Sequence, residues 1–329
     1  MLMNNTTDTL NANGTELLWP WEDDIDDAIV LIVLYYIMGI LAILANGLLL
    51  YSLCKQKKHR HNLPLFGFII GCATYGISYI YTAMYRTYVI VSKPDGTIIL
   101  VCMAYMPFFT IGNRLGCLSL LVVAFERFLA VATFSLYKKF LQRRIRWITT
   151  LLILVLTFGD VLLSWFVVAD VLYSVASPFC FTEEFMPTSY FDFHLFFNFS
   201  IGLATCFIFA FSLCTLKCSK TASNPELGAI QERRTAMVSK RLAQLFVFKI
   251  LIQIIPTVLY LVSKNSTLWE NTKSYIWFLE GINLSLYAMV YLCIDTTFRK
   301  QLVSVFPNRR AQDPINQNSR FSAGVFTSK

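Results

Sequence analysis

The residues from Ser119 to Phe134, SLLVVAFERFLAVATF, decide which fold this chain adopts. Apolar side chains dominate the stretch, yet Glu126 and Arg127 stand side by side within it. Burying two charges along an apolar helix is costly unless the charges are paired or lie near water. The stretch therefore predicts a membrane helix that ends close to the charged pair and holds the pair at the bilayer interface.

The composition extends this prediction to a protein with several membrane spans. Of the 329 residues, 56% are hydrophobic and 15% are charged, whereas soluble domains have about 25% charged residues. The net charge of +8 does not indicate a nucleic-acid partner, because the basic residues form short clusters between apolar runs. Residues 1–28 contain no Lys or Arg, so the basic start of a cleaved signal peptide is missing.

Seven apolar runs are long enough to cross a bilayer as helices, which takes about 20 residues each. They cover residues 29–53, 63–91, 97–131, 147–171, 190–216, 240–263 and 274–294. We therefore expect an all-α membrane protein, a seven-helix bundle over residues 29–294. An extracellular tail over 1–28 would precede the bundle, and a cytoplasmic helix with a disordered tail over 295–329 would follow it.

The charges between the runs predict the orientation of the bundle. Most Lys and Arg residues fall after the first, third and fifth runs and in the C-terminal tail, whereas the N-terminal tail carries only acidic charges. Because basic loops stay in the cytoplasm, we expect the N-terminus outside and the C-terminus inside. Glycosylation sequons agree with this orientation, and they lie at Asn4, Asn5, Asn13 and Asn265.

Cys102 and Cys180 are the cysteines that fall on the outer side of the predicted bundle. The extracellular compartment is oxidising, so a disulfide can persist there. We expect these two residues to form a disulfide, the alternative being two unpaired thiols at the membrane interface.

Charged residues inside the runs are candidates for function, because they usually face the bundle interior. Arg114 in the third run and Asp160 in the fourth lie at comparable depth, so they form either a structural pair or a ligand contact. Glu280 in the seventh run is a ligand candidate, because a cavity open to the outside would reach it. The alternative for Glu280 is a pair with Lys249 in the sixth run.

Aromatic residues gather in the same outer third of the runs, and the candidates are Tyr105, Phe109, Tyr275 and Trp277. Ligand pockets are mostly apolar and contain a few polar groups, as this set would with Arg114 and Glu280. For each ring the alternative is packing in the core or in an interfacial belt.

Pro256 interrupts the sixth run, in the sequence IIPTV. Proline removes a helical hydrogen bond and kinks the helix. The kink is either passive or a pivot for movement.

No pattern in the chain indicates an enzyme, a cofactor or a metal site. The sequence lacks G-x-S-x-G, H-E-x-x-H and Walker motifs. His59, His61 and His194 do not have the spacing of a set of metal ligands.

The chain resembles the rhodopsin-like seven-transmembrane G-protein-coupled receptors. Glu126, Arg127 and Phe128 stand where that family has D/E-R-Y at the inner end of its third helix. Cys102 precedes Arg127 by 25 residues, which is the family's spacing for its disulfide cysteine. Further matches are Asn46 in the first helix, Pro256 in the sixth, and Tyr291, Phe298 and Arg299 in the seventh.

The departures from that family are similar to those of the nematode serpentine chemoreceptors. Tyr287 and Ala288 replace the Asn-Pro of the seventh helix, and no aspartate lies near Cys72 in the second. The segment ERFLAVATFSLYKKF is similar to the E-R-x-x-A-T…Y-E pattern of the Sra group, which includes class ab. The final Y-E of that pattern is Y-K here, at Tyr137.

The resemblance implies a receptor in the plasma membrane. The likeness to the chemoreceptor family further implies a location in a sensory cilium. A small environmental chemical would bind in the outer third of the bundle, and helix six would shift near Pro256. The inner face would then bind a heterotrimeric G protein, and its basic loops suit an acidic partner or anionic lipid. The residues implied for coupling are Glu126, Arg127, Phe128, Lys240, Arg241 and Tyr291.

Two alternatives remain open at the level of sequence. A neuropeptide receptor of the same architecture would use the acidic WEDDIDD segment to attract a basic peptide. A transporter or a ligand-gated channel would show ligand-linked flux or current without a G protein, but the chain has no internal repeat of the kind found in many transporters.

Overall fold

The computed structural model describes residues 21–55, 63–94, 96–104, 106–140 and 142–218, with short pieces at 243–244, 246–247, 250–255 and 257–259 and residue 282. Within these ranges, five helical segments are long and apolar enough to cross a membrane. The long helices are α1 (Trp21–Lys55), α2 (Leu63–Ser92), α4 (Met106–Ala132), α6 (Arg143–Val167) and α8 (Thr188–Cys218). The expected seventh run and most of the sixth lie outside the described residues.

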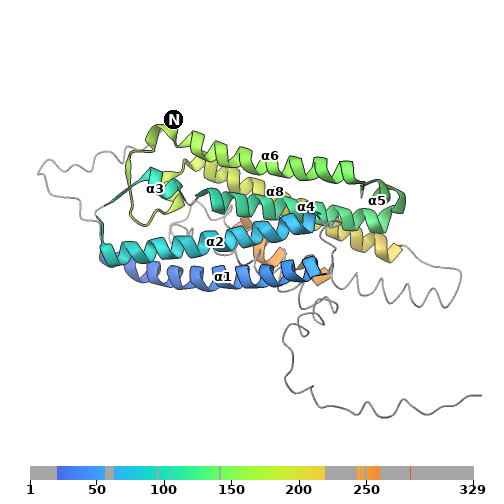
Figure 1. The fold of residues 1–329 in the computed structure, drawn as a ribbon, viewed down its shortest axis with the longest axis horizontal. Coiled ribbons are helices and arrows are strands. Elements are labelled where there is room, and N and C mark those ends of the chain that lie inside the picture. Colours follow the sequence, from blue (N-terminus) through green and yellow to red (C-terminus); the bar gives the residue numbers. More distant parts are fainter. Residues whose placement is uncertain are drawn as a thin grey trace, which may run out of the picture.

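The long helices run along one common direction (Figure 1). Helices α1 and α2 pack side by side, α4 packs against α2, and both α6 and α8 pack against α4. Helix α4, which contains the Glu126–Arg127 pair, therefore lies at the centre of the described bundle.

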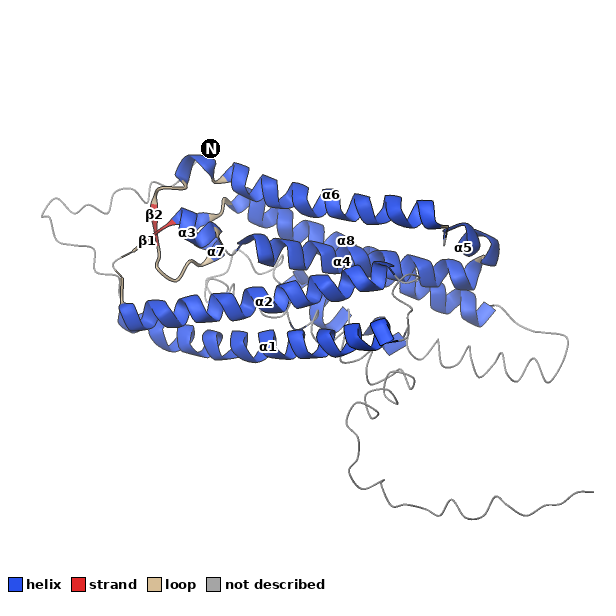
Figure 2. Ribbon diagram, viewed as in Figure 1, coloured by secondary structure: helices blue, strands red, loops and turns tan. Residues whose placement is uncertain are grey.

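The short elements at the outer end of the bundle tie the loops together (Figure 2). Strand β1 (Thr97–Ile98) pairs antiparallel with β2 (Val175–Ala176), and short helices flank this ribbon. These are α3 (Ile99–Met103), η2 (Ala169–Val171) and α7 (Thr182–Phe185). At the other end, α5 (Phe134–Phe140) connects α4 to α6.

The third run differs from the single helix that the sequence predicts over residues 97–131. The structure divides it into β1, α3 and α4. Pro107 explains the break, because it has no N–H to donate to the carbonyl of Met103 and is well suited to the first turn of a new helix. The long α4 therefore begins at Met106.

Glycines bring the backbones of α2 and α4 into direct contact. A Cβ atom added to Gly71 would lie 2.5 Å from the backbone nitrogen of Gly116. One added to Gly112 would lie 2.5 Å from the backbone nitrogen of Tyr75. Small residues one turn apart allow such close approach between membrane helices. This contact fixes the position of α4 against α2.

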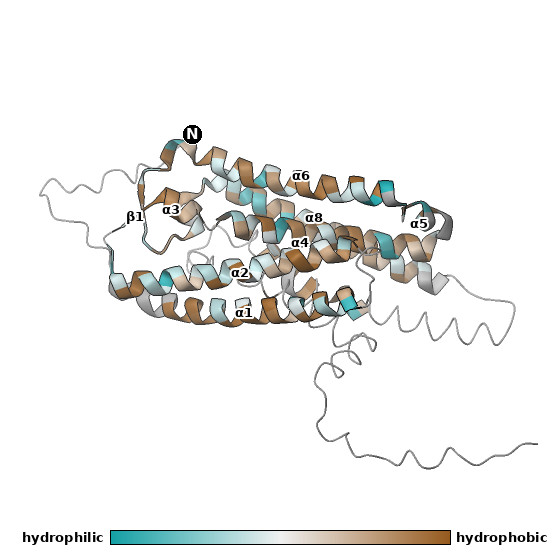
Figure 3. Cartoon of the chain, viewed as in Figure 1, coloured by the Kyte–Doolittle hydropathy of each residue, from teal (hydrophilic) through white to brown (hydrophobic). Residues whose placement is uncertain are grey.

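Of the five long helices described, α6 has the smallest share of its residues buried inside the protein. Its exposed apolar side chains include Leu151, Leu152, Val155, Phe158, Leu162 and Phe166, and apolar residues run along its length (Figure 3). An apolar face of this size is not stable in water and marks a membrane contact. Within α6, hydroxyl groups donate to carbonyls of their own helix, as Thr157 does to the carbonyl of Ile153 at 2.8 Å.

A π-helix, η3 (Ile250–Ile254), lies within the predicted sixth run and packs against α8. π-Helical turns frequently accompany kinks and functional sites in α-helices. Pro256, where the sequence predicts the kink, lies just after η3 and is itself outside the described residues.

Candidate functional site

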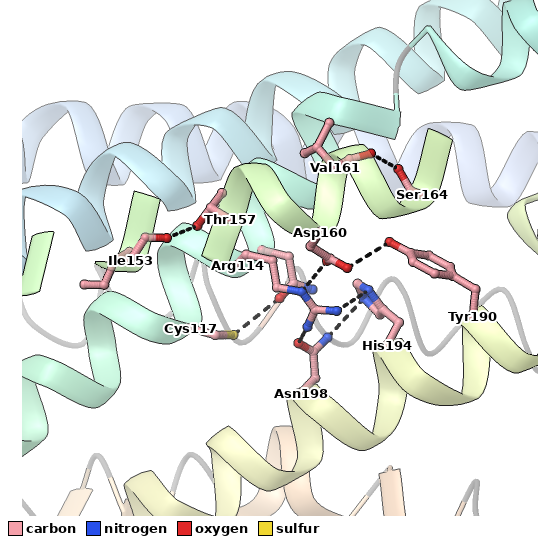
Figure 4. Close-up of polar contacts among 11 residues, drawn as sticks. Arg114, Cys117, Ile153, Thr157, Asp160, Val161, Ser164, Tyr190, His194 and Asn198 are labelled. Atoms are coloured by element: carbon pink, nitrogen blue, oxygen red, sulfur yellow. Dashed lines mark hydrogen bonds and ion pairs between the residues drawn. The ribbon is translucent and has the colours of Figure 1, made fainter. Parts of the chain in front are cut away.

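Five polar residues from three helices meet inside the outer half of the bundle (Figure 4). Arg114 comes from α4 and Asp160 from α6, whereas Tyr190, His194 and Asn198 follow one another at four-residue intervals on α8. Residues with that spacing share one face of a helix. All five side chains are buried, and Arg114 is only 1% exposed. We call this group the Arg114 cluster.

Each nitrogen of the Arg114 guanidinium has a partner. Nε donates to Oδ2 of Asp160 at 2.5 Å, Nη1 donates to Oδ1 of Asn198 at 2.6 Å, and Nη2 contacts Nδ1 of His194 at 3.0 Å. The hydroxyl of Tyr190 donates to the other carboxylate oxygen of Asp160 at 3.2 Å. The guanidinium carbon also lies 4.2 Å from the ring centre of Phe197. This pairing accounts for a cation deep in the bundle.

The contact with Arg114 sets the hydrogen-bonding role of one ring nitrogen of His194. Arginine has donors and no acceptor, so Nδ1 of His194 must accept the hydrogen bond. Nε2, the other ring nitrogen of His194, lies 3.1 Å from the side-chain amide nitrogen of Asn198.

The structure brings together Arg114 and Asp160, which the sequence left open as a structural pair or a ligand contact. Sequence reasoning missed the other three members of the cluster. A signal was present, because His194 and Asn198 are polar residues one turn apart in an apolar run.

Phe109 lies beside the Arg114 cluster on α4. Its ring centre is 4.7 Å from that of Tyr75 and 6.5 Å from that of His194. Phe109 is partly buried, so it remains a candidate for contact with a ligand above the cluster. The other predicted ligand contacts, Tyr105, Tyr275, Trp277 and Glu280, lie outside the described residues.

The disulfide predicted between Cys102 and Cys180 is confirmed. Cys102 is in α3 and Cys180 lies between β2 and α7, with Cα atoms 5.3 Å apart. Together with the β1–β2 pair, this bond holds the segment before α8 over the outer end of the bundle.

At the inner end of α4, Arg127 is exposed and Glu126 is partly buried. Oε1 of Glu126 is buried and has no hydrogen-bond partner among the described residues. The carboxylate interacts electrostatically with Arg127 and with Arg146 of α6. The rings of Phe125 and Phe140 lie 5.6 Å apart and hold α5 against this end of α4.

Several other predicted residues lie outside the part of the chain that the structure describes. They are Lys240, Arg241 and Tyr291 for coupling, Pro256 for the kink, and Asn4, Asn5, Asn13 and Asn265 for glycosylation. Within the described ranges, no group of three or more His, Cys, Asp or Glu residues could hold a metal ion.

Comparison with known families agrees with this architecture. The model of a family described as "Serpentine type 7TM GPCR chemoreceptor Srsx" matches residues 39–306. No curated protein gives a significant match. The family match confirms the all-α, multi-span membrane fold and the resemblance to nematode serpentine chemoreceptors. The matching family is Srsx and not the Sra group, whose pattern rested on one short segment with its last residue changed.

Proposed function

Because the chain belongs to the Srsx family of serpentine seven-transmembrane chemoreceptors, we propose that it signals the presence of a small environmental chemical through a heterotrimeric G protein. It is a multi-pass membrane receptor without enzymatic activity. Its proposed location is the plasma membrane, in a sensory cilium.

The observation that supports this proposal best is the distribution of charge along α4. The same helix holds Arg114 inside the bundle and exposes Arg127 at its inner end. The two residues are about 20 Å apart at 1.5 Å of rise per residue. A continuous helix can carry a shift at one end to the other, so α4 is suited to link a ligand site to a partner surface.

The Arg114 cluster gives such a shift a physical basis. Arg114 contacts Asp160 on α6 and His194 on α8, so the cluster sets how three helices sit against one another. A ligand above the cluster, near Phe109, drives signalling only if it binds the active arrangement more tightly than the resting one. In this proposal Glu126 restrains Arg127 at rest, and Arg127 contacts the G protein after activation.

The test uses cells that express the full chain, a panel of small organic compounds and basic peptides, and a G-protein activation readout. We expect at least one small compound to activate, and Arg127→Ala to abolish that response at equal surface expression. Arg144→Ala is the matched control, since Arg144 is an exposed arginine at the inner end of α6. We expect it to keep the response.

Three results would count against the proposal. Unchanged signalling by the Arg127→Ala variant would remove the role given to Arg127. Activation by peptides alone would favour a neuropeptide receptor. A ligand-evoked current or flux that persists without any G protein would indicate a channel or transporter.

A further inference from the structure

Arg86 is a second arginine buried in the outer part of the bundle, and no role is predicted for it from the sequence. It lies in α2, about 9 Å along the helix from its last residue, Ser92. Its side chain is only 4% exposed. Unlike Arg114, it has no ion pair with any carboxylate among the described residues.

The contacts of Arg86 leave one side of its guanidinium unsatisfied. Nε donates to the backbone carbonyl of Phe179 at 3.1 Å. The guanidinium carbon lies 4.6 Å from the ring centre of Phe181 and 5.3 Å from that of Tyr35 on α1. Nη1 is buried and has no hydrogen-bond partner within the described part of the chain.

This arrangement is unfavourable for a residue with only a structural role. Cation–π contacts contribute roughly 0.5–2 kcal/mol, whereas a buried unpaired donor costs about 1–3 kcal/mol and more when the group is charged. An uncompensated charge inside a membrane bundle usually marks a functional site. The unsatisfied Nη1 therefore indicates a partner that is not part of the described protein.

The segment that covers Arg86 belongs to the outer loop. Phe179 and Phe181 flank Cys180, which the disulfide ties to Cys102. Sγ of Cys180 lies 3.7 Å from the hydroxyl of Tyr85, the residue before Arg86. Arg86 therefore sits under a fixed loop on the side of the protein that faces the environment.

We propose that Arg86 binds the carboxylate of a small organic acid with an apolar body. Nη1 donates to the carboxylate, and the rings of Tyr35 and Phe181 contact the carbon skeleton. One unsatisfied nitrogen suits a singly charged carboxylate, whereas a phosphate needs several donors around it. The inference rests on the proposed function in one respect, since the acid is the environmental chemical that the receptor detects.

Direct binding tests this inference without any signalling step. The full-length receptor is purified in detergent, and its melting temperature is measured with straight-chain carboxylates from acetate to decanoate and with benzoate. The corresponding neutral amides and inorganic phosphate serve as comparison probes at equal ionic strength. We expect one or more carboxylates to raise the melting temperature, and neither the matching amides nor phosphate to do so.

Variants assign the effect to Arg86. We expect Arg86→Gln to weaken the apparent affinity for the carboxylate by about tenfold or more, and Arg86→Lys to retain part of it. Phe181→Leu removes one ring from the guanidinium and is expected to give a smaller loss. Arg144→Gln is the matched control, because Arg144 is exposed at the inner end of α6. The affinity of this variant for the carboxylate is expected to be unchanged.

The proposal is overturned if no carboxylate stabilises the receptor, if the amides stabilise it equally, or if Arg86→Gln binds as the unchanged receptor does. Non-reducing mass spectrometry of the Cys102–Cys180 bond checks that Arg86→Gln is folded. If that variant does not fold, full carboxylate affinity in both Arg86→Lys and Phe181→Leu overturns the proposal.

Carboxylate binding without G-protein activation would refute the proposed function alone. Activation by neutral compounds that Arg86→Gln leaves intact would refute the carboxylate site alone.

Discussion

At the scale of single residues, the carboxylate of Asp160 is what makes the burial of Arg114 tolerable. It is the only carboxylate that contacts Arg114 in the described part of the chain. We expect Asp160→Asn to lower the stability of the receptor by about 3–5 kcal/mol, because it leaves an uncompensated buried charge. The melting temperature of the purified receptor measures this loss.

The matched control for Asp160→Asn is Thr157→Val, a nearly isosteric change on the same helix. Thr157 is fully buried, and its hydroxyl donates only to the carbonyl of Ile153 in its own helix. Loss of this hydrogen bond is expected to lower the stability of the receptor by less than about 1 kcal/mol. The double variant Arg114→Leu/Asp160→Leu should recover part of the loss, because it removes both charges together. Equal effects of Asp160→Asn and Thr157→Val would contradict the role given to this ion pair.

The sequence predicts the residues of the Arg114 cluster and Arg86 to different extents. Arg114 and Asp160 are charges deep inside apolar runs, and the high cost of burying them makes such residues visible. The neutral partners, such as Asn198, are tolerated at many positions in membrane helices, so composition does not mark them. Arg86 lies near the end of its helix, where an arginine often reaches water. Only the packing of α1 and the outer loop shows that it is buried.

At the scale of helices, the contact between α2 and α4 depends on Gly71. A Cβ atom there would lie 2.5 Å from the nitrogen of Gly116 and 3.0 Å from the carbonyl oxygen of Gly112. Both atoms belong to the backbone, so the helices must move apart. We expect Gly71→Ala to lower stability by about 1–3 kcal/mol, the usual cost of overpacking.

Two other glycines provide matched controls for Gly71→Ala. Gly47 on α1 and Gly159 on α6 have no atom within 4 Å of an added Cβ. Alanine in place of glycine in a helix is favourable by up to about 1 kcal/mol. We therefore expect both control variants to melt at or above the temperature of the unchanged receptor. A melting temperature of Gly71→Ala as high as that of the controls would show that the two helices are not in contact.

The positions of the described helices follow from hydropathy, because a bilayer demands long apolar segments whatever the later packing. The break between α3 and α4 was not predicted, because the run that contains it is apolar throughout. Pro107 in that run is the signal that indicates the break. The pairing of β1 with β2 was missed for another reason. It joins Thr97 to Ala176, which are far apart in sequence, and each strand is too short to leave a pattern.

At the scale of the whole molecule, the two ends of the described bundle are built differently. The outer end is tied by the Cys102–Cys180 disulfide and by the β1–β2 pair. The inner end exposes Arg127 on α4. A fixed outer end keeps ligand-binding groups in place, which reduces the entropy lost on binding.

The disulfide is therefore expected to support both stability and binding at the outer end. It closes a chain segment with a sequence separation of 78, which limits its entropic contribution to about 4.5 kcal/mol. We expect Cys180→Ser to lower the melting temperature, and to weaken any carboxylate binding, because Phe179 and Phe181 flank the bond. Cys214→Ser, which changes an exposed free cysteine, is the matched control. Addition of a reducing agent should destabilise the unchanged receptor and the control, and leave Cys180→Ser as it was. If the reducing agent lowers the melting temperature of all three proteins equally, the disulfide does not hold the outer end together.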